Sequence, residues 1–264
     1  MEFSKKSKVP VFIVNTNISI DDGVKIGKPR DIFKTFLGLV AASEKQAGEL
    51  LLNSLVKEAR RNKSDKKIEV LGLSGPREAY EAVQRNSGLK IGIKNQTSVI
   101  LNQIIHANWD KDLAYKKTLR ILNRYPSLDV IWAASDSMAL GAKKAIKEKN
   151  KNIVVGGIDW SKDGINSVGN NEMDVTVGGH FMNGGIALIL LYDYFHGMDF
   201  KNELGVEINF DMFELTQDNI KNFQENFSSS QWDKIDFTKY SKVLNPKLKE
   251  YDFSLDTFIN SIKK

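Results

Sequence analysis

Short apolar runs alternate with amphipathic stretches along the first two thirds of the chain. Each run is a few residues long, which is the usual length of a buried strand. Segments with helical periodicity separate most of the runs, and this alternation is typical of βαβ units. The pattern therefore predicts an α/β fold with mainly parallel sheets. The predicted strands are 11–14, 68–73, 98–105, 128–134, 152–158 and 173–178.

Residues that favour a helix start precede five of the amphipathic segments. Ser43 and Gln46 have the spacing of a capping box, ahead of apolar residues at four-residue intervals. Pro76 suits the first position of a helix over 77–91. Acidic or hydroxyl side chains can cap the remaining three helices. These caps are Asp110, ahead of a helix that ends at Tyr125-Pro126, Asp136, ahead of Met138 to Ile146, and Ser161, ahead of a helix to Val168.

The pattern changes after residue 178. Residues 182–196 predict one more apolar helix, and 205–213 alternate like an extended strand. From 214 to 264 the chain is polar, with scattered aromatic residues and no regular period. Aromatic residues spread in this way more often cover an existing core than form a separate one. We therefore expect 214–264 to be a packed C-terminal extension.

Composition narrows the class of protein. The 264 residues suit two domains or one large one, and 41% hydrophobic with 27% charged residues can form a buried core. The absence of cysteine excludes a disulfide scaffold, a thiolate zinc site and a cysteine nucleophile. The histidines, at 106, 180 and 196, lack the spacing of a metal-ligand pair. Neither a metal nor a cofactor is expected.

The net charge of +5 is concentrated in one segment, residues 56–67, which carries a net charge of +4. Basic residues at the end of a helix complement its dipole, whereas a DNA-binding protein spreads them along a recognition surface. No nucleic-acid partner is therefore expected. The sequence has no apolar window long enough to span a membrane, and its N-terminal run is too short for a signal peptide. We expect no membrane insertion.

Sequence motifs for catalysis are absent. The chain has no G-x-S-x-G nucleophile elbow, no P-loop and no G-x-G-x-x-G fingerprint. No combination of acid, base and nucleophile can be argued from residue spacing. The sequence therefore favours a binding protein over an enzyme.

Polar and aromatic residues follow the ends of successive predicted strands. In open parallel sheets ligands bind beyond the carboxyl ends of the strands. Amides, hydroxyls, carboxylates, a guanidinium and indoles in that place suit a polyol or a sugar. A lone histidine is more often structural, so His180 is the weakest candidate. The candidate ligand-binding residues are Asn15, Arg85, Trp109, Ser135, Asp136, Asp159 and His180.

Several of these strand-end residues also have a purely structural alternative. Asp110 and Asp136 could serve only as helix caps, and Trp109 could be core packing. Arg85 could pair with Glu81 or Glu78 on a solvated helix face. The recurrence of such residues at the same end of successive strands favours ligand binding.

Five stretches of the chain carry a family resemblance. They are VPVFIVNTN (9–17), ASEKQAGELL (42–51), EAVQRNSGL (81–89), ANWDKDLAYKKTLRILNRYPSLDVIWAASDSMALGA (107–142) and IVVGGIDWSKDGINSVGNNEMDVTVGG (153–179). Through them the sequence resembles the type I periplasmic binding proteins, the family of ribose-binding and autoinducer-2-binding proteins. The resemblance runs from residue 9 to residue 212.

The resemblance implies an α/β, type I periplasmic binding protein fold, with parallel doubly wound sheets in two lobes that close on a small ligand. It implies that Asn15 and Arg85 contact ligand hydroxyls and that Trp109 stacks on the ligand. Asp159 stands where an acidic residue commonly takes ring hydroxyls. Ser135, ahead of Asp136, replaces a usual Asn, and further departures at Thr16 and Gly179 leave the ligand open.

The resemblance also implies an incomplete first lobe. Residues 1–42 and 179–213 would be the remnant of the N-terminal lobe, 43–178 a complete C-terminal lobe, and 214–264 an extension packed on the lobes. The first lobe of the family normally begins with three further βα units. We therefore interpret the chain as an N-terminally truncated form of a longer secreted protein of the periplasm.

The function implied by the resemblance is capture of a sugar or sugar-like molecule for an ABC permease. One alternative is a periplasmic sensor that signals to a membrane kinase or cyclase, which the C-terminal extension favours. Another is the effector domain of a lac-repressor-type regulator, although the chain lacks a DNA-binding headpiece.

Overall fold

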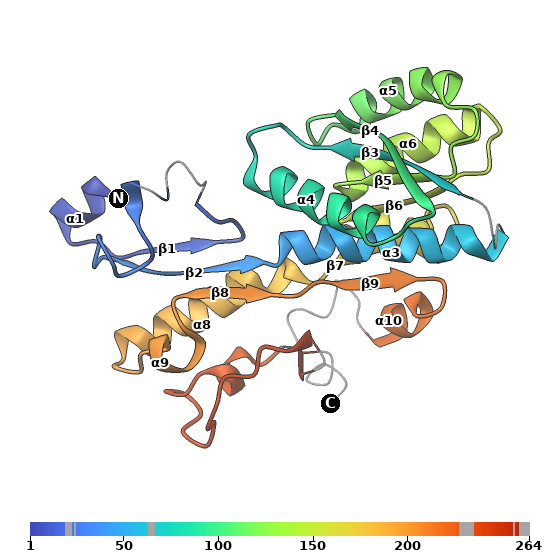
Figure 1. Cartoon of the computed structure of the whole chain (residues 1–264). Helices are drawn as coiled ribbons and strands as arrows, with labels where there is room; N and C mark the ends of the chain where they lie inside the picture. Colours follow the sequence, from blue (N-terminus) through green and yellow to red (C-terminus); the bar gives the residue numbers. More distant parts are fainter. Residues whose placement is uncertain (19–22, 24, 63–66, 227–234, 256, 259–264) are drawn as a thin grey trace. The chain divides into compact units, whose positions relative to one another are not determined.

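A computed structural model describes residues 1–18, 23, 25–62, 67–226, 235–255, 257 and 258 (Figure 1). The chain forms two compact units. The lobe boundaries expected from the sequence stay a prediction. Unit 1 consists of Met1–Ala42, His180–Phe210 and Glu225–Lys264, and unit 2 consists of Ser43–Gly179 and Asp211–Gln224.

Unit 2 contains a six-stranded sheet with the strand order β4-β3-β5-β6-β7-β9. Neighbouring strands are parallel except for β9, which is antiparallel to β7. The strands β5 and β7 are buried along their whole length, as expected for a sheet covered on both faces. The strands are β3 (Ile68–Ser74), β4 (Val99–His106), β5 (Val130–Ala133), β6 (Val154–Ile158), β7 (Val175–Gly178) and β9 (Phe213–Thr216).

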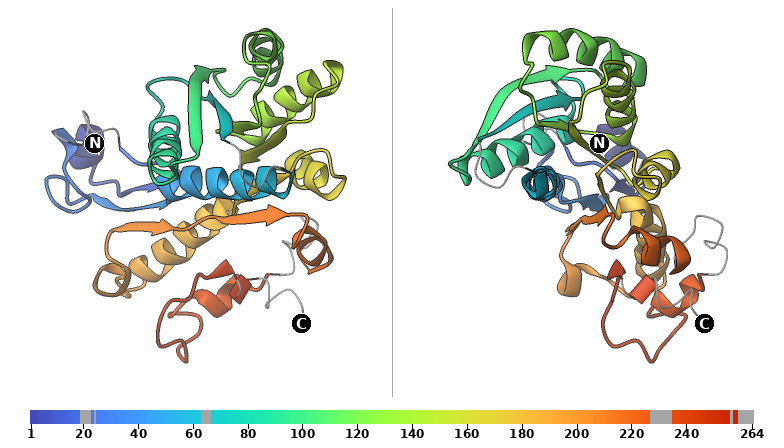
Figure 2. Two further views of the ribbon diagram at one scale, coloured as in Figure 1. Left: turned by 45° about the vertical axis from the view of Figure 1, so that its right-hand side comes forward. Right: turned by 90° about the vertical axis from the view of Figure 1, so that its right-hand side faces the viewer.

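Helices flank this sheet. The pair α3 and α4 packs together on one face, and the pair α5 and α6 packs on the other (Figures 1 and 2). Two of the predicted caps are confirmed, because Asp110 accepts a hydrogen bond from Leu113 N (2.5 Å) and Ser161 from Gly164 N (3.0 Å). The helices are α3 (Glu44–Asn62), α4 (Tyr80–Lys94), α5 (Lys111–Arg124), α6 (Asp136–Glu148), α7 (Lys162–Gly169) and α10 (Ile220–Asn226).

Unit 1 contains a parallel three-stranded sheet with the order β1-β2-β8. Its described elements are α1 (Glu2–Ser7), β1 (Val11–Val14), β2 (Phe36–Ala42), the 3-10 helix η1 (His180–Met182), α8 (Asn183–Phe195), α9 (Lys201–Leu204), β8 (Glu207–Phe210) and the 3-10 helix η3 (Phe237–Tyr240). Together with the sheet of unit 2, it confirms the α/β class with two parallel sheets.

Aromatic residues near the C-terminus join the core of unit 1. Tyr240, Phe253 and Phe258 belong to the same buried cluster as Ile186 and Leu190 of α8. The predicted covering of an existing core is therefore seen for these residues. Phe227 and Trp232, also among the predicted aromatic residues, lie outside the described residues.

The strand β2 is missing from the predicted elements. All seven of its residues, FLGLVAA, are buried, so the segment shows no alternation of polar and apolar positions. A glycine and two alanines also weaken its apolar signal. A side chain at Gly38 would be tightly placed, since its Cβ would lie 3.0 Å from the Phe12 ring and 3.1 Å from Val206 O.

The predicted strand over 205–213 is confirmed only in part, because β8 lies within it but ends at Phe210 and a second strand, β9, begins at Phe213. Strand β8 belongs to unit 1 and β9 to unit 2. Met212 lies between them, and its backbone N and O each hydrogen-bond the side chain of Gln46 at 3.0 Å. The backbone groups that a single continuous strand would use for pairing are therefore bound to α3.

The contact with Met212 also occupies the Gln46 side chain, so Gln46 does not take its part in the predicted capping box.

The start of α4 also differs from the prediction. Residues 76–79 form a turn closed by Ala79 N and Pro76 O (3.4 Å), and the helix begins at Tyr80. Of the basic segment 56–67, Arg60 and Arg61 lie in the last turn of α3, and 63–66 lie outside the described residues.

Candidate ligand-binding site

The carboxyl ends of three parallel strands bring most of the candidate residues of unit 2 to one edge of its sheet. Strand β4 leads to Trp109, β5 to Ser135 and Asp136, and β6 to Asp159. Arg85 reaches the same edge from α4, where it contacts the segment that follows β5. Strands that run in parallel present their ends together, as the sequence pattern predicted.

Arg85 is the centre of this arrangement. Its side chain is buried, and its Nε donates a hydrogen bond to Glu44 Oε2 at 2.5 Å. Its Nη1 donates to Ala134 O at 2.7 Å and to Asp159 Oδ1 at 3.1 Å. The alternative pairing with a glutamate of the same segment is therefore wrong: Arg85 points into unit 2 and not along a solvated helix face.

Two glycines allow Arg85 to reach this place. A Cβ on Gly48 of α3 would lie 2.1 Å from Arg85 O, and one on Gly88 of α4 would lie 2.0 Å from Lys45 O. No side chain fits at these distances, so the two helices cross with their backbones in contact. The close crossing brings Glu44, the first residue of α3, beside the Arg85 guanidinium.

Burial and the ion pairs together shift the pKa values of all three groups. Burial raises the pKa of Glu44, against the lowering effect of Arg85. Burial also raises the pKa of Asp159 to about 6, where Arg85 lowers it and the Asp136 charge adds to the rise. Burial would lower the pKa of Arg85, but Glu44 and Asp159 raise it above its usual value. Arg85 therefore stays charged.

Asp159 connects this buried pair to solvent. Its side chain is 37% exposed, whereas those of Glu44 and Arg85 are each 5% exposed. It directly follows β6 with φ of 139°, a conformation that L residues rarely adopt. The site therefore presents a carboxylate whose position is set by a buried guanidinium.

Trp109 is half-buried beside Arg85. It follows Asn108 in a turn where both residues have positive φ, 53° and 63°. A Cβ on Gly75 would come within 2.1 Å of the Trp109 indole, so the ring lies directly on the backbone after β3. The guanidinium carbon of Arg85 is 5.8 Å from the centre of a Trp109 ring, within cation–π range. Trp109 therefore forms part of the Arg85 site.

Ser135, and not Asp136, is the cap of α6. The Ser135 Oγ accepts a hydrogen bond from Met138 N at 3.3 Å. The predicted cap, Asp136, is fully buried and accepts from Thr176 Oγ1 at 2.7 Å, Ser161 N at 2.8 Å and Ser161 Oγ at 3.0 Å. Burial raises the pKa of Asp136. These contacts indicate a positioning role, and ligand contact by either residue stays a prediction.

Asn15 and His180 belong to unit 1. Asn15 follows β1 with φ of 65°, its backbone N donates to Val40 O at 2.8 Å, and its Oδ1 accepts from Asn183 Nδ2 at 3.3 Å. His180 is half-buried at the start of η1. Their grouping with Arg85 stays a prediction.

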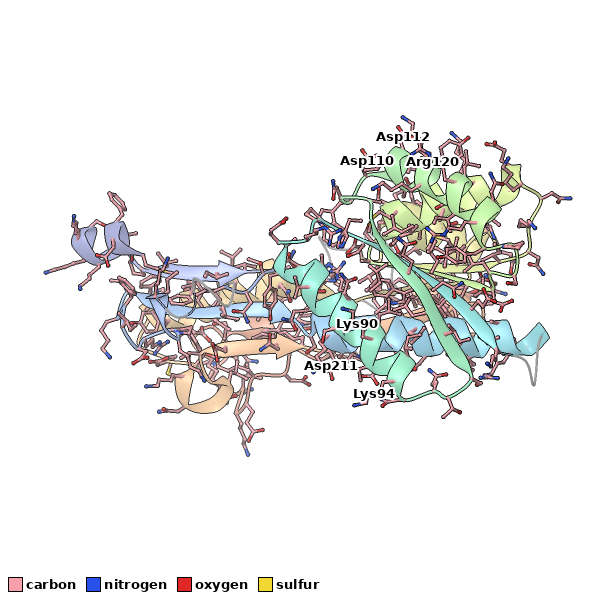
Figure 3. The ribbon with its side chains drawn as sticks, turned by 45° about the horizontal axis from the view of Figure 1, so that its top comes forward. Lys90, Lys94, Asp110, Asp112, Arg120 and Asp211 are labelled. Carbon is pink, nitrogen blue, oxygen red and sulfur yellow. The ribbon has the colours of Figure 1, made fainter. Side chains whose placement is uncertain are left out.

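Sequence reasoning missed Glu44. The candidates were chosen after the ends of predicted strands, and β2, which ends two residues before Glu44, was missing from them. Asp110 also followed a predicted strand end, but it is exposed at the start of α5, as are Asp112 and Arg120 farther along that helix (Figure 3). Its role as a cap is therefore the better interpretation.

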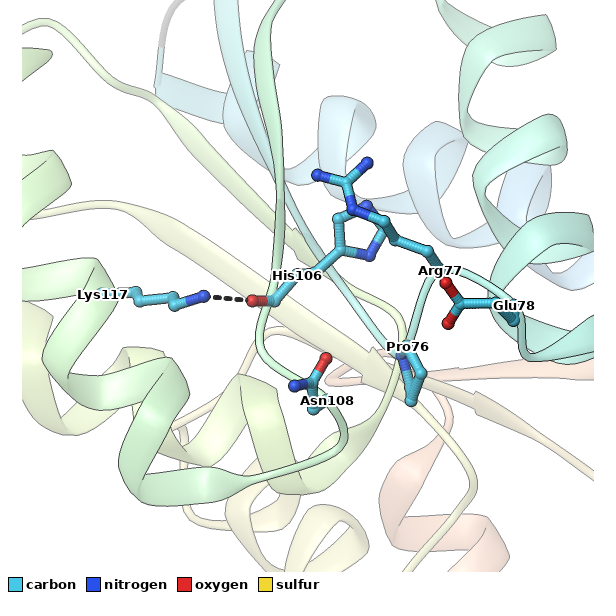
Figure 4. A pocket seen from close by; sticks show the side chains of 6 residues that line it. All are labelled: Pro76, Arg77, Glu78, His106, Asn108 and Lys117. Atoms are coloured by element: carbon cyan, nitrogen blue, oxygen red, sulfur yellow. Dashed lines mark hydrogen bonds between the residues drawn. The ribbon is translucent and has the colours of Figure 1, made fainter.

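A separate pocket of about 490 Å³ lies at the same edge of unit 2 (Figure 4). Most of its lining side chains were not singled out in the sequence. Among the described residues, no group of three or more His, Cys, Asp or Glu side chains could hold a metal ion. The pocket is lined by Pro76, Arg77, Glu78, His106, Asn108 and Lys117.

Comparison with known proteins agrees with the fold. A sequence model of the periplasmic binding protein domain matches residues 5–194. The ribose import binding protein of Haemophilus influenzae is 30% identical over 137 residues, which are 52% of this chain and 43% of that protein. The galactofuranose-binding protein of Escherichia coli is 24% identical over 181 residues, 66% of this chain and 52% of that protein. The chain thus spans about half the length of these curated relatives.

Solved structures show the same architecture. A periplasmic sugar-binding protein from Pseudomonas fluorescens matches 100% of this chain and 76% of its own, with a TM-score of 0.84 and 24% identity. At that identity the match establishes the fold alone. Among the described helices, none has the length and apolar character needed to cross a membrane. Because the domain match includes all described strands except β8 and β9, this chain belongs to the periplasmic binding protein domain family, whose members are binding proteins and not enzymes.

Proposed function

We propose that this chain captures a sugar or sugar-like small molecule in the periplasm for delivery to an ABC permease. The observation that carries the proposal is the Arg85 site of unit 2. There a buried guanidinium fixes the partly exposed carboxylate of Asp159, and the Trp109 ring lies beside it.

The chemistry of a sugar matches these groups. The Asp159 carboxylate can accept hydrogen bonds from two neighbouring hydroxyls, and it keeps a fixed direction because Arg85 holds it. The flat face of Trp109 can cover the C–H face of a sugar ring. Each hydrogen bond to a charged group contributes roughly 1.5–3 kcal/mol, so two or three of them with one stacking contact support useful affinity.

The named relatives support this class of ligand. They include ribose-, xylitol- and galactofuranose-binding proteins, and related folds hold D-allose, myo-inositol or D-fucose. All of these ligands are polyhydroxylated, and they include both ring forms and the open-chain polyol xylitol. The ligand of this chain therefore has to be found with a panel.

Isothermal titration calorimetry against D-ribose, xylitol, D-allose, myo-inositol, D-fucose and L-arabinose tests the proposal. We expect saturable binding of at least one of them. With that ligand, Trp109→Ala and Asp159→Asn are each expected to weaken binding by about tenfold or more, the equivalent of ~1.4 kcal/mol. Asp163→Asn is the matched control, since Asp163 is exposed on α7, and its affinity should equal that of the wild type.

Two results would overturn the proposal. The first is an absence of binding heat with every member of the panel, and the second is unchanged affinity in both site variants. Delivery to a permease is tested in the source organism. Deletion of the gene should abolish uptake of the labelled ligand, and normal uptake would exclude the transport role.

A further inference from the structure

A polar pocket adjoins the Arg85 site within unit 2 (Figure 4). Its walls come from the turn after β3, the end of β4 and one side of α5. Pro76 follows Gly75, on which the Trp109 ring lies, and Asn108 precedes Trp109. The same two turns therefore contribute to the Arg85 site and to the pocket, so one ligand of moderate size can reach both.

Two basic side chains line the pocket. Lys117 Nζ donates one hydrogen bond to His106 O at 2.5 Å, which leaves further N–H donors on the ammonium group. Arg77 is exposed, and its guanidinium makes no hydrogen bond or ion pair with any residue that the structure describes. Glu78 is the one carboxylate among the lining residues. The side chains therefore carry a net positive charge.

The Asn108 amide and the start of α4 add neutral groups that suit an oxyanion. Asn108 is exposed, and its amide N–H groups can donate. His106 Nδ1 lies 2.6 Å from Gly75 O, and since a carbonyl can only accept, Nδ1 donates within the fold and His106 is not among the proposed donors. The helix α4 begins two residues after Glu78, and its cap residue Ala79 offers no side-chain acceptor. The positive end of its dipole favours an anion nearby.

We propose that this pocket binds a phosphate group carried by the sugar-like ligand, with Arg77 and Lys117 as its charged donors. A tetrahedral phosphate with a charge of about −2 near neutral pH offers acceptors to two cations and an amide at once. The substrate class is then a phosphorylated sugar or polyol. The sugar part of this ligand rests on the proposed function, whereas the phosphate part rests on the pocket alone.

Calorimetric titration of the full chain at constant ionic strength tests the proposal with inorganic phosphate, D-ribose 5-phosphate and D-ribose. We expect saturable binding of both phosphates. The double variant Arg77→Gln, Lys117→Gln should weaken it by at least about tenfold. Glu78→Gln should tighten it by about threefold, because a repelling carboxylate is removed. Lys116→Gln is the matched control, since Lys116 is exposed on α5 and does not line the pocket.

The outcomes separate the two proposals. The phosphate site is overturned if neither phosphate binds saturably. It is also overturned if Lys116→Gln weakens phosphate binding as much as the double variant does, because the attraction is then only diffuse and ionic. Equal affinity for inorganic phosphate and D-ribose 5-phosphate, without binding of any neutral sugar, supports the pocket and overturns the sugar-binding proposal, because the sugar part then adds no contact. Binding of neutral sugars without binding of either phosphate supports the sugar-binding proposal and overturns the phosphate site. Far-ultraviolet circular dichroism of these variants verifies that each is folded.

Discussion

At the scale of single residues, Arg85 combines a structural and a binding role. It neutralises Glu44, whose side chain is 5% exposed, and it also orients Asp159, which reaches solvent. Removing one partner of a buried ion pair leaves an uncompensated charge. Arg85 is thus a poor position for a binding test, because its loss affects folding as well as the ligand contact.

We predict that Arg85→Ala lowers the free energy of unfolding by about 3–5 kcal/mol. The buried Glu44 carboxylate then lacks its partner. The double variant Glu44→Gln, Arg85→Met should recover most of the loss, because it removes both charges. Urea denaturation measures each value, with Arg120→Ala as the control at an exposed arginine of α5 (Figure 3). A loss below about 1 kcal/mol in Arg85→Ala would contradict the prediction.

Asp159 gives a second residue-scale prediction, for pH. Its pKa of about 6 in the folded chain lies above the ordinary value of about 3.9. The folded state therefore binds this proton more tightly than the unfolded state does. The contribution of Asp159 to stability is fully present below about pH 4 and is lost as the pH rises through about 6.

The measurement is urea denaturation of the wild type and of Asp159→Asn between about pH 4 and about pH 7. The stability of the wild type relative to the variant should fall as the pH rises across this window and then level off. A stability difference that stays constant with pH would show that Asp159 titrates at the same pH in both states.

At the scale of elements, single side chains connect segments that are far apart in the sequence. Gln46 of α3 binds both backbone groups of Met212, and Asp193 of α8 binds the C-terminal segment. The Asp193 carboxylate is buried and accepts from Ser241 Oγ, Lys242 N at 2.7 Å, Val243 N at 3.3 Å and Tyr251 Oη at 2.8 Å. This one carboxylate therefore anchors residues 241–251 to α8.

We predict that Asp193→Ala lowers the free energy of unfolding by about 3 kcal/mol, since several hydrogen bonds to a charged group are lost. Amide hydrogen exchange should become faster in residues 241–251 than in the strands of unit 2. Asp31→Ala serves as the control, because Asp31 is an exposed aspartate of the same unit. Equal effects of the two substitutions on stability and exchange would refute the anchoring role.

At the scale of the whole molecule, the chain has two units with separate sheets, and it passes between them after residues 42, 179, 210 and 224. Unit 2 holds the Arg85 site and the adjoining pocket on its own, while Asn15 and His180 belong to unit 1. Both proposals therefore depend on contacts within one unit. The chain spans about half the length of its curated relatives. The sugar-binding function of those proteins is therefore only proposed for this chain.

The amino-acid sequence alone determined the parallel α/β class, most strands, the family resemblance and the positions of Trp109 and Asp159 at strand ends. These follow from local periodicity and from the order of elements. Only the tertiary structure decided that Glu44 pairs with Arg85, that Gln46 binds Met212, and that Ser135 caps α6 while Asp136 is buried.

The physical reason is the range of the interactions. Strand and helix patterns arise from neighbouring residues, whereas the Glu44–Arg85 pair joins residues that are 41 positions apart. It forms because Gly48 and Gly88 let α3 and α4 cross in contact. The pocket between Arg77 and Lys117 likewise depends on two turns meeting at one edge of the sheet. Such meetings are set by packing across the fold, which no local pattern in the sequence encodes.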